Sequence, residues 1–316
     1  MTAMIYPTTN PAAAEQMMVA RAEGPYIFDQ QGKRYLEGMA GLWCTALGYG
    51  NEEIIDVAQR QMRDLSFSHM FGGKTHAAAI ELADKLAGMV PMNDGRVFLG
   101  NSGSDANDTL MKLIRYHAEA SGQPDRIKVI AREQGYHGVT LASAALTAIP
   151  TNHTHFQLPF EALGVLRTGS ANYYRGGHDG ESESEFVARR AQELEALILA
   201  EGPGTIAAMI AEPVSGAGGV IVPPAGYFDA IQQVLDRYGI WLWDDEVICG
   251  FGRLGTDFGA TKMGMAPKMM TLAKALSSAY VPISAAIVQG DIADCIGASA
   301  TDVGVFGHGY TYSGHP

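Results

Sequence analysis

Between residues 96 and 288, short apolar runs alternate with amphipathic helical patterns, and this alternation constrains the fold more than any other feature. Helical periodicity covers 105–119, 185–200 and 227–238. Runs that are apolar throughout predict strands buried on both faces, and their alternation with helices predicts an α/β fold with a mostly parallel sheet sandwiched by helices. Ligands of such sheets bind at the carboxyl ends of the strands. The runs are RVFLG, IKVIAR, TIAAMIAEP, GIWLWDDE, KMMTLAK and ISAAIV.

The region before this alternation has a different pattern. YIFDQQGKRYLEG predicts two short strands around a turn at Gln31 and Gly32, and a helix is expected to begin near Asn51. KTHAAAIELADKLAGM predicts a second helix. Further along, SANYYRGGHDGESESE is the most polar and glycine-rich insert and is expected to be a surface loop.

Composition excludes several classes of function. With 316 residues, 47% of them hydrophobic and 18% charged, the chain can bury a large core. Its net charge of −12 and pI near 5.1 argue against nucleic-acid or anionic-membrane partners. Cys44, Cys249 and Cys295 are far apart, which favours a reducing cytoplasm over a disulfide framework. We find neither an export signal nor an apolar run of about 18 residues, so no membrane span is expected.

The stretch WLWDDEVICGFGRLG contains a G-x-G-x-x-G pattern at Gly250, Gly252 and Gly255. A dinucleotide-binding loop requires a helix after the glycines and an acidic residue about 20 residues further on. Here Gly259 and Gly264 interrupt any such helix, and the acidic residues Asp244, Asp245 and Glu246 precede the glycines. We therefore interpret these glycines as an ordinary turn after a strand.

Two other motifs are misleading. GGKTH resembles part of a phosphate-binding Walker loop, but Ser68 stands where a further glycine is needed. His153 and His155 are the one close histidine pair, and they lack the helical spacing or neighbouring cysteine of a metal site. We expect no metal site.

The sequence LGNSGSDANDTL places Ser102, Gly103, Ser104 and Asp105 between an expected strand and an expected helix. Small residues at a helix N-terminus leave backbone N–H groups free to bind an anion, most often a phosphate. An ordinary serine or aspartate N-cap explains the same residues. This motif alone does not decide between the two.

Lys274 and Asp245 follow two different expected strands at their carboxyl ends. Apolar surroundings should lower the pKa of Lys274, and a neutral amine can form a Schiff base, although an exposed lysine is the alternative. A carboxylate such as Asp245 could keep the ring nitrogen of a pyridine cofactor protonated, although a structural salt bridge is the alternative. A phosphate site, a lysine and a carboxylate at strand ends together fit pyridoxal 5′-phosphate (PLP).

Seven stretches spread over nearly the whole chain resemble motifs of the class III aminotransferases of fold type I, especially their ω-amino acid and amine:pyruvate branch. The resemblance implies a PLP-dependent homodimer with shared active sites, in which 1–60 belongs to a smaller domain and 61–316 forms the large PLP-binding domain. The family continues into a C-terminal small domain, which we expect this chain to lack. The stretches are GMAGLWC, NSGSDANDTL, YHG, AEPVSGAGGVIVPP, WDDEVICGFGRLG, TLAKALSSAY and GHGYTYSGHP.

The resemblance also implies roles for individual residues. Lys274 would carry the cofactor as a Schiff base and move the proton, and Asp245 would pair with the pyridinium. Val247 and Tyr136 would pack on the two ring faces, and Trp43 would line the substrate pocket together with Tyr136. The remaining cofactor-binding residues are Ser102, Gly103 and Ser104 near the phosphate, joined by Thr311 of the other subunit, His137 of YHG, and Glu212 near the cofactor oxygen.

Three positions depart from the family pattern. Asp244 stands where a small apolar residue is usual, beside Asp245, and adjacent carboxylates disfavour each other's ionisation. We therefore expect Asp244→Ala to change the pH titration of the bound cofactor. Ala275 replaces a common glycine, and Lys268 replaces a common acidic residue.

The expected function is a ping-pong transamination from an ω-amino acid or amine to a keto acid such as pyruvate. Two alternatives remain at this stage. Another class III PLP reaction, an aminomutase or a decarboxylase, would use Lys274 and Asp245 equally well. A truncated, non-catalytic PLP-binding remnant would explain the missing C-terminal domain.

Overall fold

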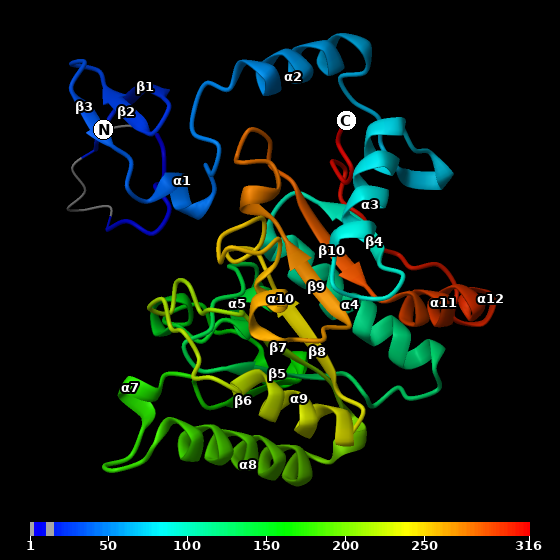
Figure 1. Ribbon diagram of the computed structural model, residues 1–316. Helices are drawn as coiled ribbons and strands as arrows, with labels where there is room; N and C mark the ends of the chain where they lie inside the picture. The colour runs from blue at the N-terminus through cyan, green and yellow to red at the C-terminus, as the bar shows by residue number, and fades with distance from the viewer. Residues whose placement is uncertain (1–2, 11–15) are drawn as a thin grey trace.

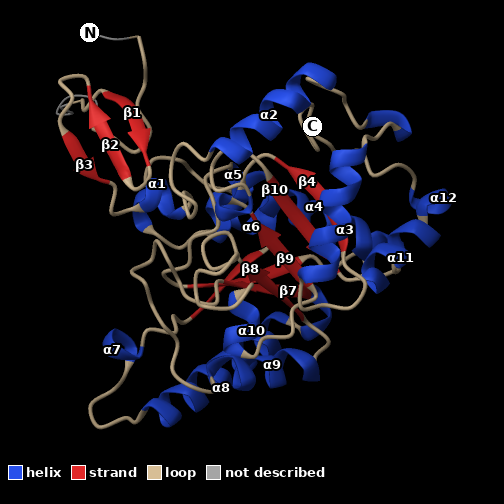
Figure 2. Ribbon diagram, turned by 45° about the horizontal axis from the view of Figure 1, so that its top comes forward, coloured by secondary structure: helices blue, strands red, loops and turns tan. Residues whose placement is uncertain are grey.

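A computed structural model describes residues 3–10 and 16–316, so 1–2 and 11–15 of the N-terminal segment expected over 1–60 lie outside the described residues. A three-stranded antiparallel sheet, β1 (Val19–Glu23), β2 (Tyr26–Asp29) and β3 (Arg34–Leu36), stands apart from the rest in both views (Figures 1 and 2). The two predicted strands are β2 and β3. The prediction missed β1, which pairs with β2.

Three helices connect this small sheet to the rest of the chain: α1 (Ala40–Trp43), α2 (Glu52–Asp64) and α3 (Ala77–Met89). The expected start near Asn51 is confirmed, because its side chain accepts a hydrogen bond of 3.2 Å from Ile54 N and caps α2. The expected second helix is α3, whose Ala79 and Leu86 are buried. A 3₁₀ turn, η1 (Phe71–Gly73), lies between α2 and α3.

The main sheet has seven strands in the order β4-β10-β9-β8-β7-β5-β6. All pair in parallel except β10, which is antiparallel to both of its neighbours, so the predicted mostly parallel sheet is confirmed. The prediction missed β6. The bounds are β4 (Arg96–Gly100), β5 (Lys128–Arg132), β6 (Val165–Thr168), β7 (Ile206–Ala211), β8 (Trp241–Asp245), β9 (Met269–Leu272) and β10 (Ser284–Val288).

Helices cover both faces of this sheet. Side chains of α4 (Gly103–Ala120), α5 (Leu141–Leu146) and α11 (Gly290–Ala298) pack on one face. Those of α3, α8 (Glu183–Glu201), α9 (Tyr227–Arg237) and α10 (Gly259–Met263) pack on the other (Figure 1). Successive strand residues point to opposite faces, so neighbours on one strand contribute to different layers.

The remaining elements are short. They are α6 (Phe160–Leu163), α7 (Tyr173–Gly176), α12 (Ala300–Val303) and the 3₁₀ turns η2 (Pro150–Asn152), η3 (Pro203–Thr205) and η4 (Lys274–Leu276). The insert expected to be a surface loop is partly anchored: it contains α7, Ala171 in it is buried, and Tyr173 packs against the core. In the described ranges, no helix is long and apolar enough to cross a membrane.

Candidate active site

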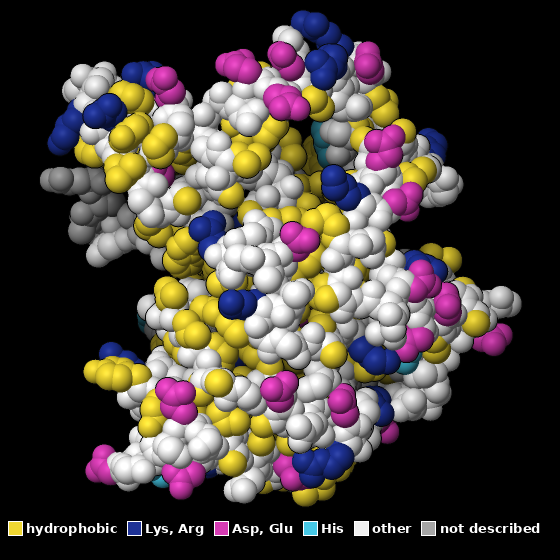
Figure 3. Space-filling model, in the orientation of Figure 1, with side chains coloured by type: hydrophobic (Ala, Val, Ile, Leu, Met, Phe, Trp, Pro, Cys, Tyr) yellow, Lys and Arg dark blue, Asp and Glu magenta, His cyan; other side chains and the backbone are white. Residues whose placement is uncertain are grey.

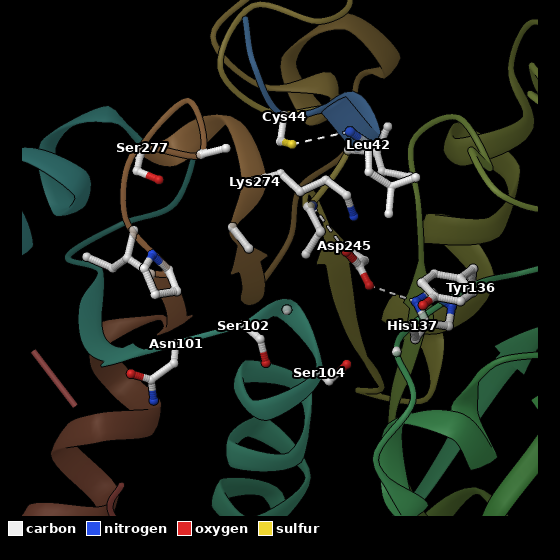
Figure 4. A pocket seen from close by; sticks show the side chains of 18 of the residues that line it. Leu42, Cys44, Asn101, Ser102, Ser104, Tyr136, His137, Asp245, Lys274 and Ser277 are labelled. Atoms are coloured by element: carbon white, nitrogen blue, oxygen red, sulfur yellow. Dashed lines mark hydrogen bonds and ion pairs between the residues drawn. The ribbon is translucent and has the colours of Figure 1, made fainter. Parts of the chain in front are cut away.

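A cavity of about 460 Å³ lies at the carboxyl ends of the central strands, where the sheet topology predicts a ligand (Figure 4). It brings together nine of the predicted site residues from five separate stretches of chain. The lining includes Leu42, Cys44, Asn101, Ser102, Gly103, Ser104, Tyr136, His137, Gly138, Glu212, Asp245, Val247, Ile248, Ala273, Lys274, Ser277, Ala279, Val281, Pro282 and Ile283.

The floor of the cavity is the N-terminus of α4. Ser102 caps the helix by accepting a hydrogen bond of 3.2 Å from Asp105 N, so the N-cap interpretation is correct for this residue. The first N–H groups of a helix have no partner within it, and those of Gly103 and Ser104 are at the cavity. Ser104 Oγ accepts from Val139 N at 3.1 Å, which leaves its own hydroxyl proton available to a ligand. The N-cap is therefore compatible with an anion bound at these N–H groups.

Lys274 follows β9 and reaches the cavity from above the strand ends (Figure 4). Its φ of 45° places the backbone in the left-handed region, which is uncommon for a lysine and typical of functional sites. Burial lowers the pKa of the Lys274 amine, and the nearby Asp245, Cys44 and Glu212 oppose that shift in part. The amine therefore loses its proton more readily than an exposed lysine does.

Asp245 ends β8 and is only 3% exposed. Its Oδ2 accepts from His137 Nδ1 at 2.8 Å and from Asn107 Nδ2 at 3.2 Å, and its Oδ1 accepts from Val247 N at 3.1 Å. Sequence reasoning missed Asn107. Its spacing contains the signal, because Asn107 stands three and four residues before the buried Leu110 and Met111 on the apolar stripe of α4.

Tyr136 and His137 enter from the segment after β5, and Glu212 enters just after β7. Glu212 accepts backbone hydrogen bonds from Tyr136 N at 3.0 Å and from Gly216 N at 2.8 Å, which holds the YHG segment against the AEP segment. Burial raises the pKa of Glu212. His137 is buried and, within the described residues, its Nε2 has no hydrogen-bond partner.

Asp244 lies on the opposite face of β8 from Asp245, as the alternation of strand side chains requires. It is fully buried, and no described residue donates to either of its carboxyl oxygens. Burial first, and then the facing Glu246 and neighbouring Asp245, raise the pKa of Asp244 well above its usual value, and Arg132 opposes the shift. Because two carboxylates contain no donor, Asp244 and Glu246 can bond to each other only by sharing a proton.

Two predicted site residues are not brought to this cavity. Trp43 does not line the cavity, whereas its neighbours Leu42 and Cys44 do. Trp43 has a φ of 59° at the kinked end of α1, which turns adjacent side chains in different directions. Thr311 is exposed in the C-terminal turn and also stands outside the lining. Its expected role in the site of another subunit stays a prediction.

Comparisons with known proteins agree with this arrangement. The model of the family "Aminotransferase class-III" matches residues 9–316. A probable mitochondrial γ-aminobutyrate transaminase 2 of Oryza sativa is 48% identical over 303 residues, covering 96% of this chain and 61% of the relative. Vanillin aminotransferase of Capsicum annuum is 46% identical, covering 96% of this chain and 66% of the relative.

Solved structures give the same result. The crystal structure of the ω-transaminase from Pseudomonas jessenii in complex with PMP superposes with a TM-score of 0.96 at 47% identity, covering 99% of this chain and 69% of that chain. The chain thus spans about three fifths of the length of the first curated relatives it matches. On the family match, the sequence identity and the shared fold, the protein belongs to the class III aminotransferases.

Proposed function

We propose that the protein is a PLP-dependent transaminase that moves an amino group from an ω-amino acid or an amine to a keto acid such as pyruvate, by a ping-pong cycle. One observation carries the proposal: a single cavity contains Lys274, whose amine has a lowered pKa, the buried carboxylate of Asp245, and the free N-terminus of α4. The names of the relatives, a γ-aminobutyrate transaminase and an ω-transaminase among them, support amino-group transfer.

The residues present fit PLP, the cofactor of the family. Gly103 is close-packed under the cavity, since a Cβ built there would lie 2.9 Å from Val247 Cγ2, and its small size leaves the backbone N–H open to a phosphate. The chain's net charge is −12, so an anion needs this local attraction from a helix N-terminus. Asp245 offers a carboxylate of the right sign to a protonated ring nitrogen.

When bound, PLP supplies an electron sink that stabilises negative charge on the substrate carbon. The chain's own residues supply the rest. Lys274 Nζ, whose lowered pKa favours loss of its own proton, would accept the proton from the substrate carbon and pass it to the cofactor carbon. Asp245, held by His137, Asn107 and Val247, keeps a proton on the ring nitrogen.

The other assignments are proposals of the same kind. Val247 and Tyr136 flank the two faces of the ring, because both line the cavity from opposite segments. Glu212, bonded to Tyr136 N, lies near the cofactor oxygen. His137 acts through Asp245 rather than on the cofactor directly, because its Nδ1 is hydrogen-bonded to that carboxylate at 2.8 Å. Trp43 belongs to the substrate pocket of the assembled enzyme.

We further propose a homodimer in which Thr311 of one subunit completes the phosphate site of the other. Large hydrophobic side chains are exposed at the cavity and beside it: Leu42 is 57% exposed, Val139 is 63% exposed and Leu141 is 64% exposed. Hydrophobic side chains are exposed at several places on the face shown in Figure 3. Apolar surface of this kind favours association with a partner. Sedimentation equilibrium tests the dimer, and weaker PLP binding by Thr311→Val tests the shared site.

The domain division and the compartment are also proposals. We place 1–60 in a small domain and 61–316 in the large PLP-binding domain; the separate sheet β1–β3 supports the division. Cys44, Cys249 and Cys295 are free, which supports a reducing compartment such as the cytoplasm. Relatives include proteins named mitochondrial and chloroplastic, so the family is not confined to one compartment.

The test is the visible absorbance of the purified chain with added PLP. We expect a band from protein-bound cofactor that bleaches when β-alanine or 1-phenylethylamine is added and returns when pyruvate is added. Lys274→Met should abolish the cycle. The matched control Lys268→Met removes a lysine that forms an exposed ion pair of 3.0 Å with Asp291, and it should leave the cycle intact.

Other outcomes identify the alternatives. A donor that is consumed without any need for pyruvate, with release of carbon dioxide or with conversion to an isomer, would replace transamination by decarboxylation or an aminomutase reaction. A band that no amine donor bleaches would indicate a non-catalytic PLP-binding remnant. No band at all would overturn the proposal.

A further inference from the structure

A chain of buried polar side chains lies directly beneath Asp245 and comes from three different elements. Trp243 is on β8, Thr271 on β9 and Asn107 on α4, and none of them is more than 1% exposed. In the sheet, Asp245 is paired with Thr271, so their side chains share the face covered by α4. A polar group buried at this depth is costly unless it is hydrogen-bonded. Each of the three is hydrogen-bonded to the next.

The chemistry of the first member gives this chain a direction. Trp243 Nε1 can only donate, and it lies 2.8 Å from Thr271 Oγ1. Thr271 Oγ1 therefore accepts there, and its own hydroxyl donates to Asn107 Oδ1, at 2.6 Å. That bond turns the Asn107 amide so that Nδ2 faces the carboxylate of Asp245 and the carbonyl of His137, at 3.2 and 2.6 Å. The His137 carbonyl can only accept, so it requires Nδ2 on its side, and the Thr271 hydroxyl, which accepts from the indole, supplies the matching donor to Oδ1.

The end of the chain is the group that would face the cofactor. Asp245 Oδ2 receives N–H donors from Asn107 and His137, and its Oδ1 receives Val247 N. Three N–H donors hold the carboxylate in one rotamer. If the Asn107 amide were reversed, its Oδ1 would face Asp245 Oδ2, and two acceptors would repel each other. The orientation of this one amide therefore decides whether the carboxylate is supported or opposed.

We propose that Trp243, Thr271 and Asn107 form a one-directional hydrogen-bond relay and are positioning residues for Asp245. None of them lines the cavity, so they act on the cofactor only through that carboxylate. This inference rests on the proposed function, because it assigns Asp245 to the ring nitrogen of PLP. The relay fixes the carboxylate before the cofactor arrives, which lowers the entropy lost on binding.

Thr271→Val tests the relay, because it removes the hydroxyl and nearly conserves the volume. Thr271→Ser keeps the hydroxyl and should rescue. The matched control is Thr109→Val, which removes an equally buried hydroxyl from α4 that bonds Asp105 O at 2.8 Å, outside the relay. If Thr271→Val and Thr109→Val lower the unfolding free energy equally, a difference between them in PLP binding reports positioning of Asp245 and not general destabilisation.

Two readouts are needed, and the first does not require PLP. With ¹⁵N-tryptophan labelling, the indole N–H resonance that Trp243→Phe removes should be protected from exchange, should shift in Thr271→Val, and should stay near its wild-type position in Thr271→Ser and Thr109→Val. The second readout is the Kd for PLP, which should rise about two- to tenfold in Thr271→Val, the value of one net hydrogen bond, and by less than twofold in Thr271→Ser and Thr109→Val.

Each remaining outcome is decisive. If the indole resonance is unaffected by Thr271→Val, the relay does not exist as drawn. If the resonance shifts but Thr271→Val and Thr109→Val bind PLP equally well, the relay is structural and does not position Asp245. If the wild-type chain never binds PLP, the proposed function fails, and the positioning role fails with it.

Discussion

Replacing Gly103 by alanine should weaken PLP binding, because the added methyl group would collide with Val247, which also lines the cavity. A Cβ at this position would lie 2.9 Å from Val247 Cγ2 and 3.2 Å from Val247 Cγ1. Carbon atoms in good contact are about 3.5 to 4.0 Å apart, so Val247 or the start of α4 must move by roughly 0.6 Å. Valine has few χ1 alternatives, so rotation of the side chain offers little relief.

The cost should appear in binding rather than in folding. Without cofactor, Val247 can move into the open cavity that it lines together with Gly103. With PLP bound, that space is filled and the overlap cannot be relieved. Overpacking of this size costs about 1–3 kcal/mol. The Kd for PLP should therefore rise about 5- to 150-fold, while the unfolding free energy of the cofactor-free protein changes little.

The assay is a titration of cofactor-free protein with PLP, followed by visible absorbance. The control is Gly88→Ala on α3, where no atom lies within 4 Å of the built Cβ; it should leave the Kd unchanged. The double variant Gly103→Ala with Val247→Ala removes the clashing methyl groups, so its loss should be smaller than the sum of the two single losses. A wild-type Kd for Gly103→Ala, or strictly additive losses in the double variant, would refute the reasoning.

Three further predictions follow from the buried ionisable groups. Burial and the facing carboxyl raise the pKa of Asp244 above 3.8, so the folded state binds more protons than the unfolded state and stability falls as pH rises from about that value. Asp244→Asn should flatten the dependence of the unfolding free energy on pH and add about 1–3 kcal/mol at neutral pH, since the amide can donate to the facing carboxylate. An unchanged pH dependence contradicts this. Burial lowers the pKa of Lys274, so between the folded-state pKa and 10.5 the unfolded chain binds more protons, and stability rises with pH across this window. Lys274→Met should raise the Tm of the cofactor-free protein at neutral pH. A lower Tm would show that burial does not penalise the charged amine. Burial raises the pKa of the Cys249 thiol, whereas Cys44 is half-buried at the cavity. Peptide mass spectrometry should show that iodoacetamide labels Cys44 in competition with PLP and leaves Cys249 unlabelled until the protein unfolds. Early labelling of Cys249 would be inconsistent with its burial.

Much of the main sheet was predictable because its signals are local. Continuous apolar runs predicted six of the seven strands. The prediction missed β6, whose four residues include the half-buried Arg167 and carry too short a signal. It could not foresee that β10 runs antiparallel to both neighbours, because a short apolar run contains no information about direction. Direction comes from the path of the chain between strands.

The cavity residues were predictable for a different reason. Lys274, Asp245 and Gly103 stand in long motifs beside strand ends, and a parallel sheet brings strand ends together. Trp43 and Thr311 were carried over from the same motifs, yet among the described residues they stand outside the lining. Motif resemblance names a residue, but the local backbone and any second subunit determine where its side chain lies.

By itself, the sequence determined the layered fold class, the family motifs and the identity of the chemical groups, because periodicity and motif spacing are properties of neighbouring residues. The tertiary structure alone decided that Asn107 and Thr271, 164 positions apart, share a hydrogen bond that orients Asp245. It also decided that Asp244 is fully buried on the opposite face of β8 without a donor. Both depend on which strands are neighbours in the sheet and on which helices cover each face. Long-range packing decides that arrangement, and the local sequence pattern does not.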